Sequence, residues 1–400
     1  MLRSLYSGIS GLRSHQTMLD VTGNNIANVN TTGFKASSVQ FQDTLSQMTQ
    51  GAGGPQAQAG GTNPAQVGLG VQVAGISTNF TQGSSQATGK ATDMMISGDG
   101  FFVTSKGGEQ LYTRAGAFEL DSTGRLVSPD GAILQGWMAV NGQIPVGGPI
   151  GPIDLSPEAI SEAKPTTSAE LSGNLPADAK DGDALVRDVE IYTADGTKST
   201  MSLTFTREID TVAGTNSWVV TNSVGGASVA TLDVAANGTL SLNGAQSPVS
   251  TPAGNVAVNL STLTGYAGMT TVGFESQNGR AAGALESFTM ANDGTLMGSF
   301  SNGQQAVVGR IALANFTNPG GLEKAGSSSY RVTANSGQVE LGTAGTGGLG
   351  TLAGGSLEMS NVDLSQEFTN LIVAQRGFQA NARIITTSDE VLQELTNLKR

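Results

Sequence analysis

Apolar side chains recur every seven residues near the end of the chain, and this spacing most constrains the fold. A heptad repeat places such side chains along one side of an α-helix. It predicts a helix from about Asn361 to the end, entered through a capping box of Ser360 and Asp363. The repeat consists of Leu364, Leu371, Phe378, Ile385 and Leu392, with Phe368 in the second position of the seam.

The start of the chain carries a similar stripe. Its apolar residues alternate spacings of three and four, with interruptions at Gln16 and Gly23. This pattern predicts a second amphipathic helix. The stripe consists of Leu2, Leu5, Ile9, Leu12, Leu19 and Ile26.

These two stripes need a partner surface. Burial of each large apolar side chain is worth roughly 1.5–3 kcal/mol, and helices are stabilised mainly by packing. Pairing the two helices within one chain brings the termini together and leaves much of each stripe for other chains. We therefore predict that the stripes form a subunit interface, and that the ends are poorly ordered in the monomer and become ordered on assembly.

The middle of the chain changes to period two and is broken by glycine-containing turns. Residues 100–116 predict a hairpin about Gly107 and Gly108. Asp-Gly or Asn-Gly supplies the turn in "YTADGTKSTMSLTF", "AANGTLSLNG" and "MANDGTLMGSF". The fold class predicted is multidomain, with paired coiled-coil-like terminal helices and nested all-β domains between them.

Composition shifts suggest the domain boundaries. Residues 151–284 hold 14 acidic and 6 basic side chains, which accounts for most of the net charge of −12. We interpret this block as part of a separately folded, solvated β-domain. The expected division is a helical core at 1–30 and 360–400, a connecting segment at 31–70 with a flexible loop at 50–66, a discontinuous β-domain at 71–145 and 285–359, and an inserted outer β-domain at 146–284.

Charge and composition exclude several classes of protein. A net charge of −12 without a basic cluster argues against binding nucleic acid. The chain has no cysteine, so disulfide and thiolate chemistry are excluded. No apolar run is long enough to span a membrane, and the start, "MLRSLYSGISGL", lacks the pattern of a cleaved secretory signal.

The stretch "NNIANVNTTGFK", residues 24–35, places many carboxamides where the first helix should end. Asparagine accepts and donates hydrogen bonds, tolerates left-handed backbone and competes for main-chain groups. We therefore expect Asn24, Asn25, Asn28 and Asn30 to end the helix and to bond to adjacent chains. Gly33 then permits a sharp turn that Phe34 anchors. A simple helix end with no partner is the alternative.

This stretch resembles the N-terminal signature of the bacterial flagellar rod and hook proteins, carried here by Asn24, Asn25, Asn28, Gly33 and Phe34. The C-terminal residues 360–398 are similar to the matching end of that family. Residues 67–102 and 309–330 also look like hook sequences. The resemblance covers roughly two-thirds of the chain.

The resemblance implies a structural subunit, exported without a cleaved signal, that polymerises into the curved hook. This tube acts as a universal joint that transmits torque from rod to filament. It implies as partners copies of the same chain, the rod, hook cap and hook–filament junction proteins and the type III export apparatus. A distal rod subunit is the alternative within the family, and the inserted block favours the hook.

Signals for an enzyme are weak. His15 is the only histidine, which excludes a triad or a metal site with several histidines. "GTGGLG" at 345–350 and "GSSQATGKA" at 83–91 only imitate nucleotide-binding loops. Asp93 and Asp99 leave a carboxylate-pair glycosidase formally open. We expect no catalytic residue, cofactor or metal site, and keep a secreted β-rich adhesin as the alternative of a different class.

Overall fold

The computed structural model describes residues 2–56, 60–140, 142–145, 147–156, 160–210, 215–222, 228–235, 237–243 and 247–397. The chain divides into two compact units. Unit 1 comprises Met1–Leu155, Phe288–Met297 and Val307–Arg400, and unit 2 comprises Ser156–Ser287 and Gly298–Ala306. Unit 2 therefore overlaps most of the block expected as an inserted β-domain.

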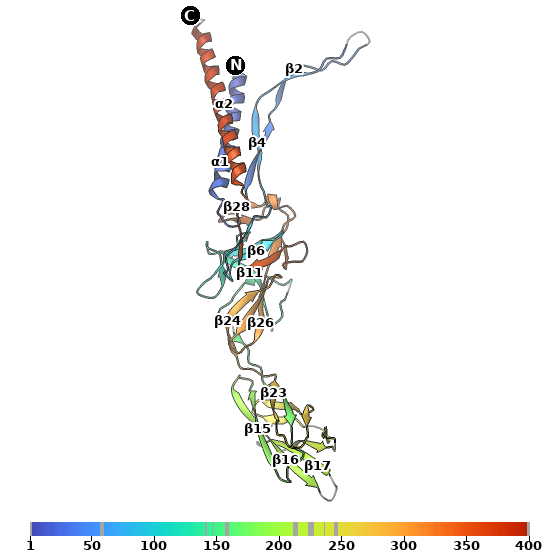
Figure 1. The fold of residues 1–400 in the computed structure, drawn as a ribbon. Helices are drawn as coiled ribbons and strands as arrows, with labels where there is room; N and C mark the ends of the chain where they lie inside the picture. Colours follow the sequence, from blue (N-terminus) through green and yellow to red (C-terminus); the bar gives the residue numbers. More distant parts are fainter. Residues whose placement is uncertain are drawn as a thin grey trace. The chain divides into compact units, whose positions relative to one another are not determined.

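Two antiparallel helices in unit 1, α1 (Leu2–Ala27) and α2 (Leu364–Asn397), carry the two ends of the chain (Figure 1). As α1 advances from Gly8 to His15, the facing positions on α2 recede from Ile385 to Gly377. The pairing of terminal helices that the sequence predicts is confirmed.

Small residues set how closely the helices approach. A Cβ on Gly11 would lie 2.7 Å from Asn381 Oδ1, and a Cβ on Gly377 would lie 2.6 Å from the ring of His15. Each glycine thus receives a side chain from the opposite helix. The most buried described positions of α1 are the small or polar residues Gly8, Gly11, Ser14, Thr22 and Asn25.

The entry into α2 differs from the prediction. The helix begins at Leu364, and the Asp363 carboxylate accepts hydrogen bonds from the backbone N–H groups of Ser365 at 2.8 Å and Gln366 at 3.2 Å. Asp363 is therefore the N-cap itself. The predicted capping box was wrong because Ser360 lies three residues earlier, in the buried connection after β32, where its hydroxyl accepts from the Val362 N–H.

The remaining elements of unit 1 are short strands and one 3₁₀ turn. They are β1 (Ser37–Asp43), β2 (Ser46–Gln50), β3 (Ala65–Gly68), β4 (Val71–Thr78), β5 (Ser85–Ala87), β6 (Met94–Ser97), β7 (Phe101–Lys106), β8 (Glu109–Thr113), β9 (Glu119–Leu120), β10 (Leu126–Val127), β11 (Ile133–Met138), β12 (Gly151–Pro152), β27 (Leu313–Asn315), η1 (Pro319–Gly321), β28 (Glu323–Gly326), β29 (Ser329–Arg331), β30 (Glu340–Gly342), β31 (Thr351–Gly354) and β32 (Ser356–Glu358).

The main sheet of unit 1 has the strand order β26-β11-β7-β8-β29-β28. The predicted hairpin is confirmed, since β7 and β8 pair up to Lys106 and Glu109, and Gly107 and Gly108 both have positive φ. One face of this sheet carries an aromatic core. Phe101 packs edge-on against Phe316, with their ring centroids 5.7 Å apart.

The segment expected as a flexible loop at 50–66 is partly a hairpin. β2 pairs antiparallel with β3 from Ser46 and Gly68 onward, and Gly53 and Thr62 exchange two backbone hydrogen bonds beyond it. Residues 57–59 lie outside the described residues. Strands β1 and β4, which precede and follow this hairpin in the chain, also pair antiparallel (Figure 1).

Unit 2 is built from two sheets that share one core. β15-β16-β17-β18-β19 form an antiparallel sheet, and β20-β21-β14-β22, with β23 paired to β14, form the other. Side chains of both sheets, including Leu171, Phe205 and Trp218, form one hydrophobic cluster. The strands are β13 (Ile160–Ser161), β14 (Ser168–Asn174), β15 (Ala184–Tyr192), β16 (Lys198–Asp210), β17 (Thr215–Asn222), β18 (Ser228–Val234), β19 (Leu240–Leu242), β20 (Val249–Thr251), β21 (Gly254–Asn259), β22 (Leu263–Thr264) and β23 (Gly273–Gln277).

Three strands have residues in both units. They are β24 (Gly283–Met290), β25 (Thr295–Phe300) and β26 (Gln305–Ile311). The predicted all-β character of the region between the terminal helices is confirmed, and the Asp-Gly turns lie where they were expected, between β15 and β16 and between β24 and β25.

Gly11 and Gly23 offer a matched test of the close helix contact. A Cβ on Gly23 would meet nothing within 4 Å, whereas one on Gly11 would displace Asn381. We expect Gly11→Gln to destabilise unit 1 by about 1–3 kcal/mol through overpacking. Gly23→Gln should stabilise it by up to about 1 kcal/mol through helix propensity. Chemical unfolding of unit 1 measures both changes, and equal effects of the two substitutions would contradict the proposed packing.

The β15–β16 turn predicts how unit 2 responds to acid. Hydrogen bonds from the Thr193 and Thr197 side chains lower the pKa of Asp195 from 3.8 to about 2. A carboxyl whose pKa is depressed on folding contributes stability above pH 4 and loses it as the pH falls toward 2. With Asp195→Asn, the free energy of unfolding of unit 2 should therefore fall less steeply as the pH drops from 4 toward 2.

The measurement can be confined to unit 2. The chain has two tryptophans, Trp137 in unit 1 and Trp218 in unit 2, and both are buried. In a Trp137→Phe background, Trp218 fluorescence reports unit 2 alone. The exposed Glu275→Gln is the control, and an identical acid limb in both variants would refute the role of Asp195.

Candidate subunit interface

The heptad residues of α1 and α2 are only partly covered within one chain. On α1, the described side chains of the stripe, Leu5, Ile9, Leu12, Leu19 and Ile26, are half-buried. The side chain of Leu2 lies outside the described residues. On α2, the half-buried positions of the repeat are Leu371, Phe378, Ile385 and Leu392.

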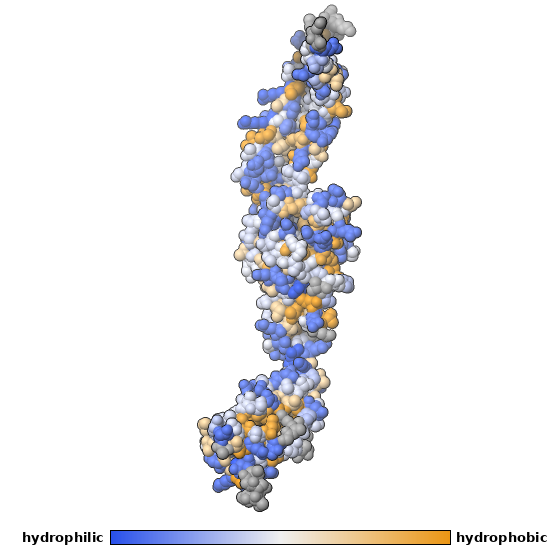
Figure 2. Space-filling view, turned by 90° about the vertical axis from the view of Figure 1, so that its right-hand side faces the viewer, coloured by the Kyte–Doolittle hydropathy of each residue, from blue (hydrophilic) through white to orange (hydrophobic). Residues whose placement is uncertain are grey.

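Other apolar side chains of α2 lie on both flanks of this half-buried line. Leu364, Phe368 and Ile372 follow one another at spacings of four and are 40%, 52% and 49% exposed. A second exposed set consists of Val373, Ile384, Val391 and Leu395. Figure 2 shows hydrophobic side chains at the surface of this helical part of the chain. Of the predicted interface residues on α2, Leu364 and Phe368 are therefore exposed on one flank, whereas the other predicted positions are half-buried.

The β2–β3 hairpin adds further exposed apolar side chains in unit 1. Leu45 is 85% exposed, Met48 59% and Val67 44%. None of these residues was singled out by the sequence pattern, because the hairpin is short and rich in glycine, alanine and glutamine.

The asparagines of the terminal motif bond within the chain. The Asn25 carboxamide is 1% exposed; its Nδ2 donates to the Ser37 carbonyl at 2.8 Å and to Glu367 at 3.1 Å, and its Oδ1 accepts from the Ser37 N–H at 3.0 Å. Asn25 therefore ties α1 to β1 and to α2. For Asn25, the expectation of bonds to adjacent chains was wrong, because the carboxamide is buried and already satisfied.

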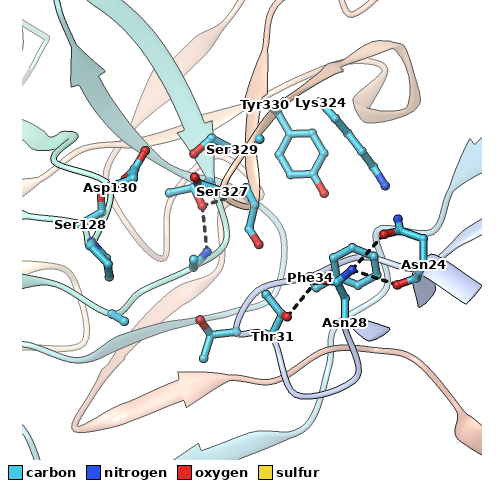
Figure 3. Close-up of a pocket in the computed structure, with 17 residues that line it drawn as sticks. Asn24, Asn28, Thr31, Phe34, Ser128, Asp130, Lys324, Ser327, Ser329 and Tyr330 are labelled. Atoms are coloured by element: carbon cyan, nitrogen blue, oxygen red, sulfur yellow. Dashed lines mark hydrogen bonds between the residues drawn. The ribbon is translucent and has the colours of Figure 1, made fainter. Parts of the chain in front are cut away.

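Asn24 and Asn28 close the end of α1. Asn28 Nδ2 donates to the Asn24 carbonyl at 2.9 Å and to its side-chain oxygen at 3.1 Å, and Thr31 donates to Asn28 at 3.0 Å (Figure 3). These bonds satisfy a carbonyl of the last helical turn. The carboxamides of Asn24 and Asn28 thus end the helix, which both interpretations of the sequence expect.

Gly33 makes a turn that no larger residue fits. Its φ is +66°, its N–H donates to the Glu358 carbonyl at 2.8 Å, and a Cβ there would lie 2.4 Å from the Ala115 nitrogen. The expected sharp turn is confirmed. Phe34 is half-buried beside it, with the Lys324 ammonium 5.3 Å from its ring centroid.

A buried ion cluster lies directly after this turn. Lys35 Nζ donates to Glu358 Oε1 at 2.6 Å and to the Thr81 carbonyl at 2.8 Å, and the Gly83 N–H donates to the same carboxylate oxygen at 2.9 Å. Arg114 Nη1 lies 3.5 Å from the other oxygen of Glu358. The side chains of Lys35 and Glu358 are fully buried, and that of Arg114 is 3% exposed.

Burial dominates the electrostatics of this cluster. It lowers the pKa of Lys35 and of Arg114, although Glu358 opposes both shifts. It also raises the pKa of the adjacent Tyr330 to about 12. Arg114 is further held by the Gly98 carbonyl at 2.8 Å and by the face of Phe101, at 5.3 Å from the ring centroid.

The terminal motif borders a cavity of about 600 Å³ (Figure 3). Hydroxyl side chains, among them Thr31, Ser128 and Ser329, line much of it, together with Lys324 and Tyr330. Lys324 Nζ donates to the Ser37 hydroxyl at 2.9 Å, so this lysine already has a partner.

Sequence reasoning missed four residues that join the two ends of the chain: Lys35, Arg114, Glu358 and Asn361. Asn361 Oδ1 accepts from the Ala36 N–H at 2.8 Å, and its Nδ2 donates to backbone carbonyls that include that of Asn79 at 2.9 Å. The available signal was the lysine that directly follows the glycine and phenylalanine of the motif, and the lone glutamate ahead of the predicted second helix.

The weak enzyme signals find no supporting structure. Strand β31 follows residues 345–350, and turns follow β5 in the segment 83–91, whereas nucleotide-binding loops open a helix. Gly100 has a φ of +125°, so Asp99 precedes a turn. Among the described residues, no group of three or more potential ligands could hold a metal ion, and no helix is long and apolar enough to cross a membrane.

Comparison with known families matches both ends and part of the β-region. The models described as "Flagella basal body rod protein", "Flagellar hook protein FlgE/F/G D1 domain" and "Flagellar basal body rod FlgEFG protein C-terminal" match residues 5–35, 95–162 and 353–398. The chain is 41% identical to the flagellar hook protein FlgE of Borreliella burgdorferi over the full length of both chains. The chain belongs to the flagellar hook and rod protein family.

Further relatives extend the same result. The flagellar hook protein FlgE of Escherichia coli is 36% identical over 98% of each chain. The flagellar basal-body rod protein FlgG of Bacillus subtilis is 34% identical over the full length of both. The family resemblance of the sequence is confirmed, and full-length membership of a hook family leaves no support for the adhesin alternative.

The ion cluster yields a stability prediction for this family member. Lys35→Met leaves Glu358 buried with a poorer set of donors, and the loss of one partner of a buried pair costs about 3–5 kcal/mol. Unfolding of unit 1, followed by Trp137 fluorescence in a Trp218→Phe background, should show this loss. Lys90→Met removes an exposed lysine and should change stability by less than about 0.5 kcal/mol. Equal effects of the two substitutions would show that the cluster does not hold unit 1 together.

Proposed function

We propose that the chain is a non-catalytic structural subunit of the flagellar hook, which polymerises into a curved tube that acts as a universal joint between rod and filament. Its membership of the hook and rod family supports this role. The main support for contacts between subunits is the set of exposed apolar side chains on both flanks of the α1–α2 pair.

Copies of the same chain are the partners that we expect to bury these flanking side chains. Within one molecule, small residues of α1 and α2 bring the helices together, as Gly8 does beside Ile385 and Gly11 beside Asn381. The large apolar residues of the heptad stripes are covered only in part. Full burial of an exposed leucine, isoleucine or phenylalanine is worth roughly 1.5–3 kcal/mol. The flanking residues are about half exposed, so each gains about half of this on burial by a neighbour. Large exposed apolar surfaces mark interaction sites. We propose that these flanks, the half-buried heptad residues and the exposed face of β2–β3 form the lateral contacts of the polymer.

The remaining subunit surface supports sliding rather than tight contact. Only 13% of the residues are charged, and 56 of 400 are glycine. We propose that apolar helix contacts resist torque while the weakly charged β-surfaces move past one another as the tube bends. Unit 2, which carries most of the net negative charge, provides the solvent-facing part of the subunit in this proposal.

The family suggests further partners for the proposed hook subunit. These are the rod, hook cap and hook–filament junction proteins and the type III export apparatus. A subunit of the distal rod is the alternative within the family. We also propose that the ends of α1 and α2 become fully ordered only when neighbouring copies cover their apolar flanks.

Polymerisation tests the proposed interface. Phe368→Ser together with Ile372→Ser removes two exposed side chains from one flank and leaves the half-buried line toward α1 unchanged. A loss of about 1.5–3 kcal/mol per contact corresponds to a rise of about ten- to a hundredfold in the critical concentration for assembly. Sedimentation and electron microscopy measure this change.

Val186→Ser, an exposed position 53% accessible in unit 2, is the matched control and should polymerise normally. Normal tubes from the double variant would reject the flank as an interface. Leu371→Ser and Phe378→Ser should instead weaken both the helix pair and the polymer, because these side chains lie at the half-buried line.

A further inference from the structure

Strand β16 directs alternate side chains into the core of unit 2. This inward row begins with Met201, Leu203 and Phe205, which are almost fully buried. Arg207 occupies the next inward position and is 2% exposed, and Trp218, its pairing partner on β17, is 1% exposed. A cation thus stands in a row of apolar side chains. We propose that unit 2 binds a small monovalent anion, of which chloride is the simplest, at Arg207.

The guanidinium of Arg207 has more hydrogen-bond donors than partners. Its Nε and Nη1 are buried without a hydrogen-bond partner in the part of the chain that the structure describes, and its Nη2 reaches the Ala177 carbonyl only at 3.5 Å. The indole Nε1 of Trp218 is also buried and has no partner there. Guanidinium and indole N–H groups donate and do not accept. Two neighbouring side chains therefore present orphaned donors, which favours a ligand that accepts hydrogen bonds.

The positive charge of Arg207 is not balanced by a carboxylate of the described residues. None of the ion pairs between these residues includes Arg207. Asp181 lies close in the fold, but it is exposed and its carboxylate accepts from the Ile209 N–H at 2.9 Å. The Trp218 ring centroid lies 5.6 Å from Arg207 Cζ, and this cation–π contact attracts the charge without accepting its N–H groups.

An arginine cannot avoid the cost of burial by losing its proton. Burial lowers the pKa of Arg207, but a guanidinium stays protonated in proteins. Removal of an unpaired charge from water is strongly unfavourable. In unit 1, the buried cations Lys35 and Arg114 share the carboxylate of Glu358. Arg207 has no such partner among the described residues, so an anion taken from solution fits the site.

The surroundings favour an anion that is small and singly charged. Trp218 belongs to the hydrophobic cluster of unit 2, so the ligand loses most of its hydration. A second negative charge, as in sulfate, would increase the desolvation cost with only one cation to balance it. A halide accepts several N–H groups without a fixed geometry, which suits donors on two different side chains. The anion completes the core at this end of β16 and stabilises unit 2.

Urea unfolding of the full-length, unassembled chain tests this inference, and the result does not depend on polymerisation. In the Trp137→Phe background, Trp218 fluorescence follows unit 2 in sodium chloride and, at equal ionic strength, in sodium methanesulfonate, whose anion is bulkier. With a dissociation constant of about 20 mM, chloride at about 0.2 M should raise the folding equilibrium constant about tenfold. Equal stability in the two salts would overturn the proposal.

Two substitutions separate this site from a general effect of salt. Arg207→Met removes the cation and keeps an apolar side chain in the inward row, so the stability of unit 2 should no longer depend on chloride. Lys180→Met removes an exposed cation of the same unit and should keep the chloride dependence. The same dependence in both variants would assign the effect to salt in general and reject Arg207 as the site.

Bromide quenching reports binding directly and decides the proposal even if Arg207→Met does not fold. Bromide bound beside Trp218 should quench its fluorescence with saturation in the Trp137→Phe chain, although the indole is buried. Collisions from solvent would instead give weak quenching that rises linearly with bromide. Linear quenching alone would show that water molecules, and not an anion, satisfy Arg207.

Discussion

The buried contact of Lys35 and Arg114 with Glu358 holds unit 1 together. It joins the segment after α1, the end of β8 and the strand that precedes α2 at one carboxylate. Fully buried ions are tolerated only when each is paired and hydrogen-bonded, so these three segments must meet with little freedom. The backbone bond from Gly33 to Glu358 and the carboxamide bonds of Asn25 extend the same constraint to both helices.

Fixing both helix roots sets the register of the α1–α2 pair. Within that register, Gly11 faces Asn381 and Gly377 faces His15, which lets the helices approach through small residues. The larger apolar side chains are then displaced to the flanks, where one chain cannot cover them. A contact that makes the monomer's helices fit closely thus also creates the surface that we propose for polymerisation.

Turns could be predicted from the sequence where they depend on neighbouring residues alone. Gly107 and Gly108 predicted a tight hairpin because two consecutive positive φ values strongly favour glycine in such a turn. The start of α2 was misjudged by three residues because Ser360 and Asp363 are both good capping residues and the rule cannot choose between them. Burial of Ser360 after β32 settled that choice, and burial depends on the rest of unit 1.

The sequence alone determined that two amphipathic helices at the ends enclose a β-rich middle, since periodicity and turn chemistry are encoded over a few residues. It also determined the family, because the motifs at both ends are specific. Only the tertiary structure decided which side chains meet: Lys35 and Glu358 are 323 residues apart in the chain, and no local pattern records their contact. It likewise decided that the helices pair through small residues, because a heptad repeat identifies an apolar stripe without stating which part of it a partner helix covers.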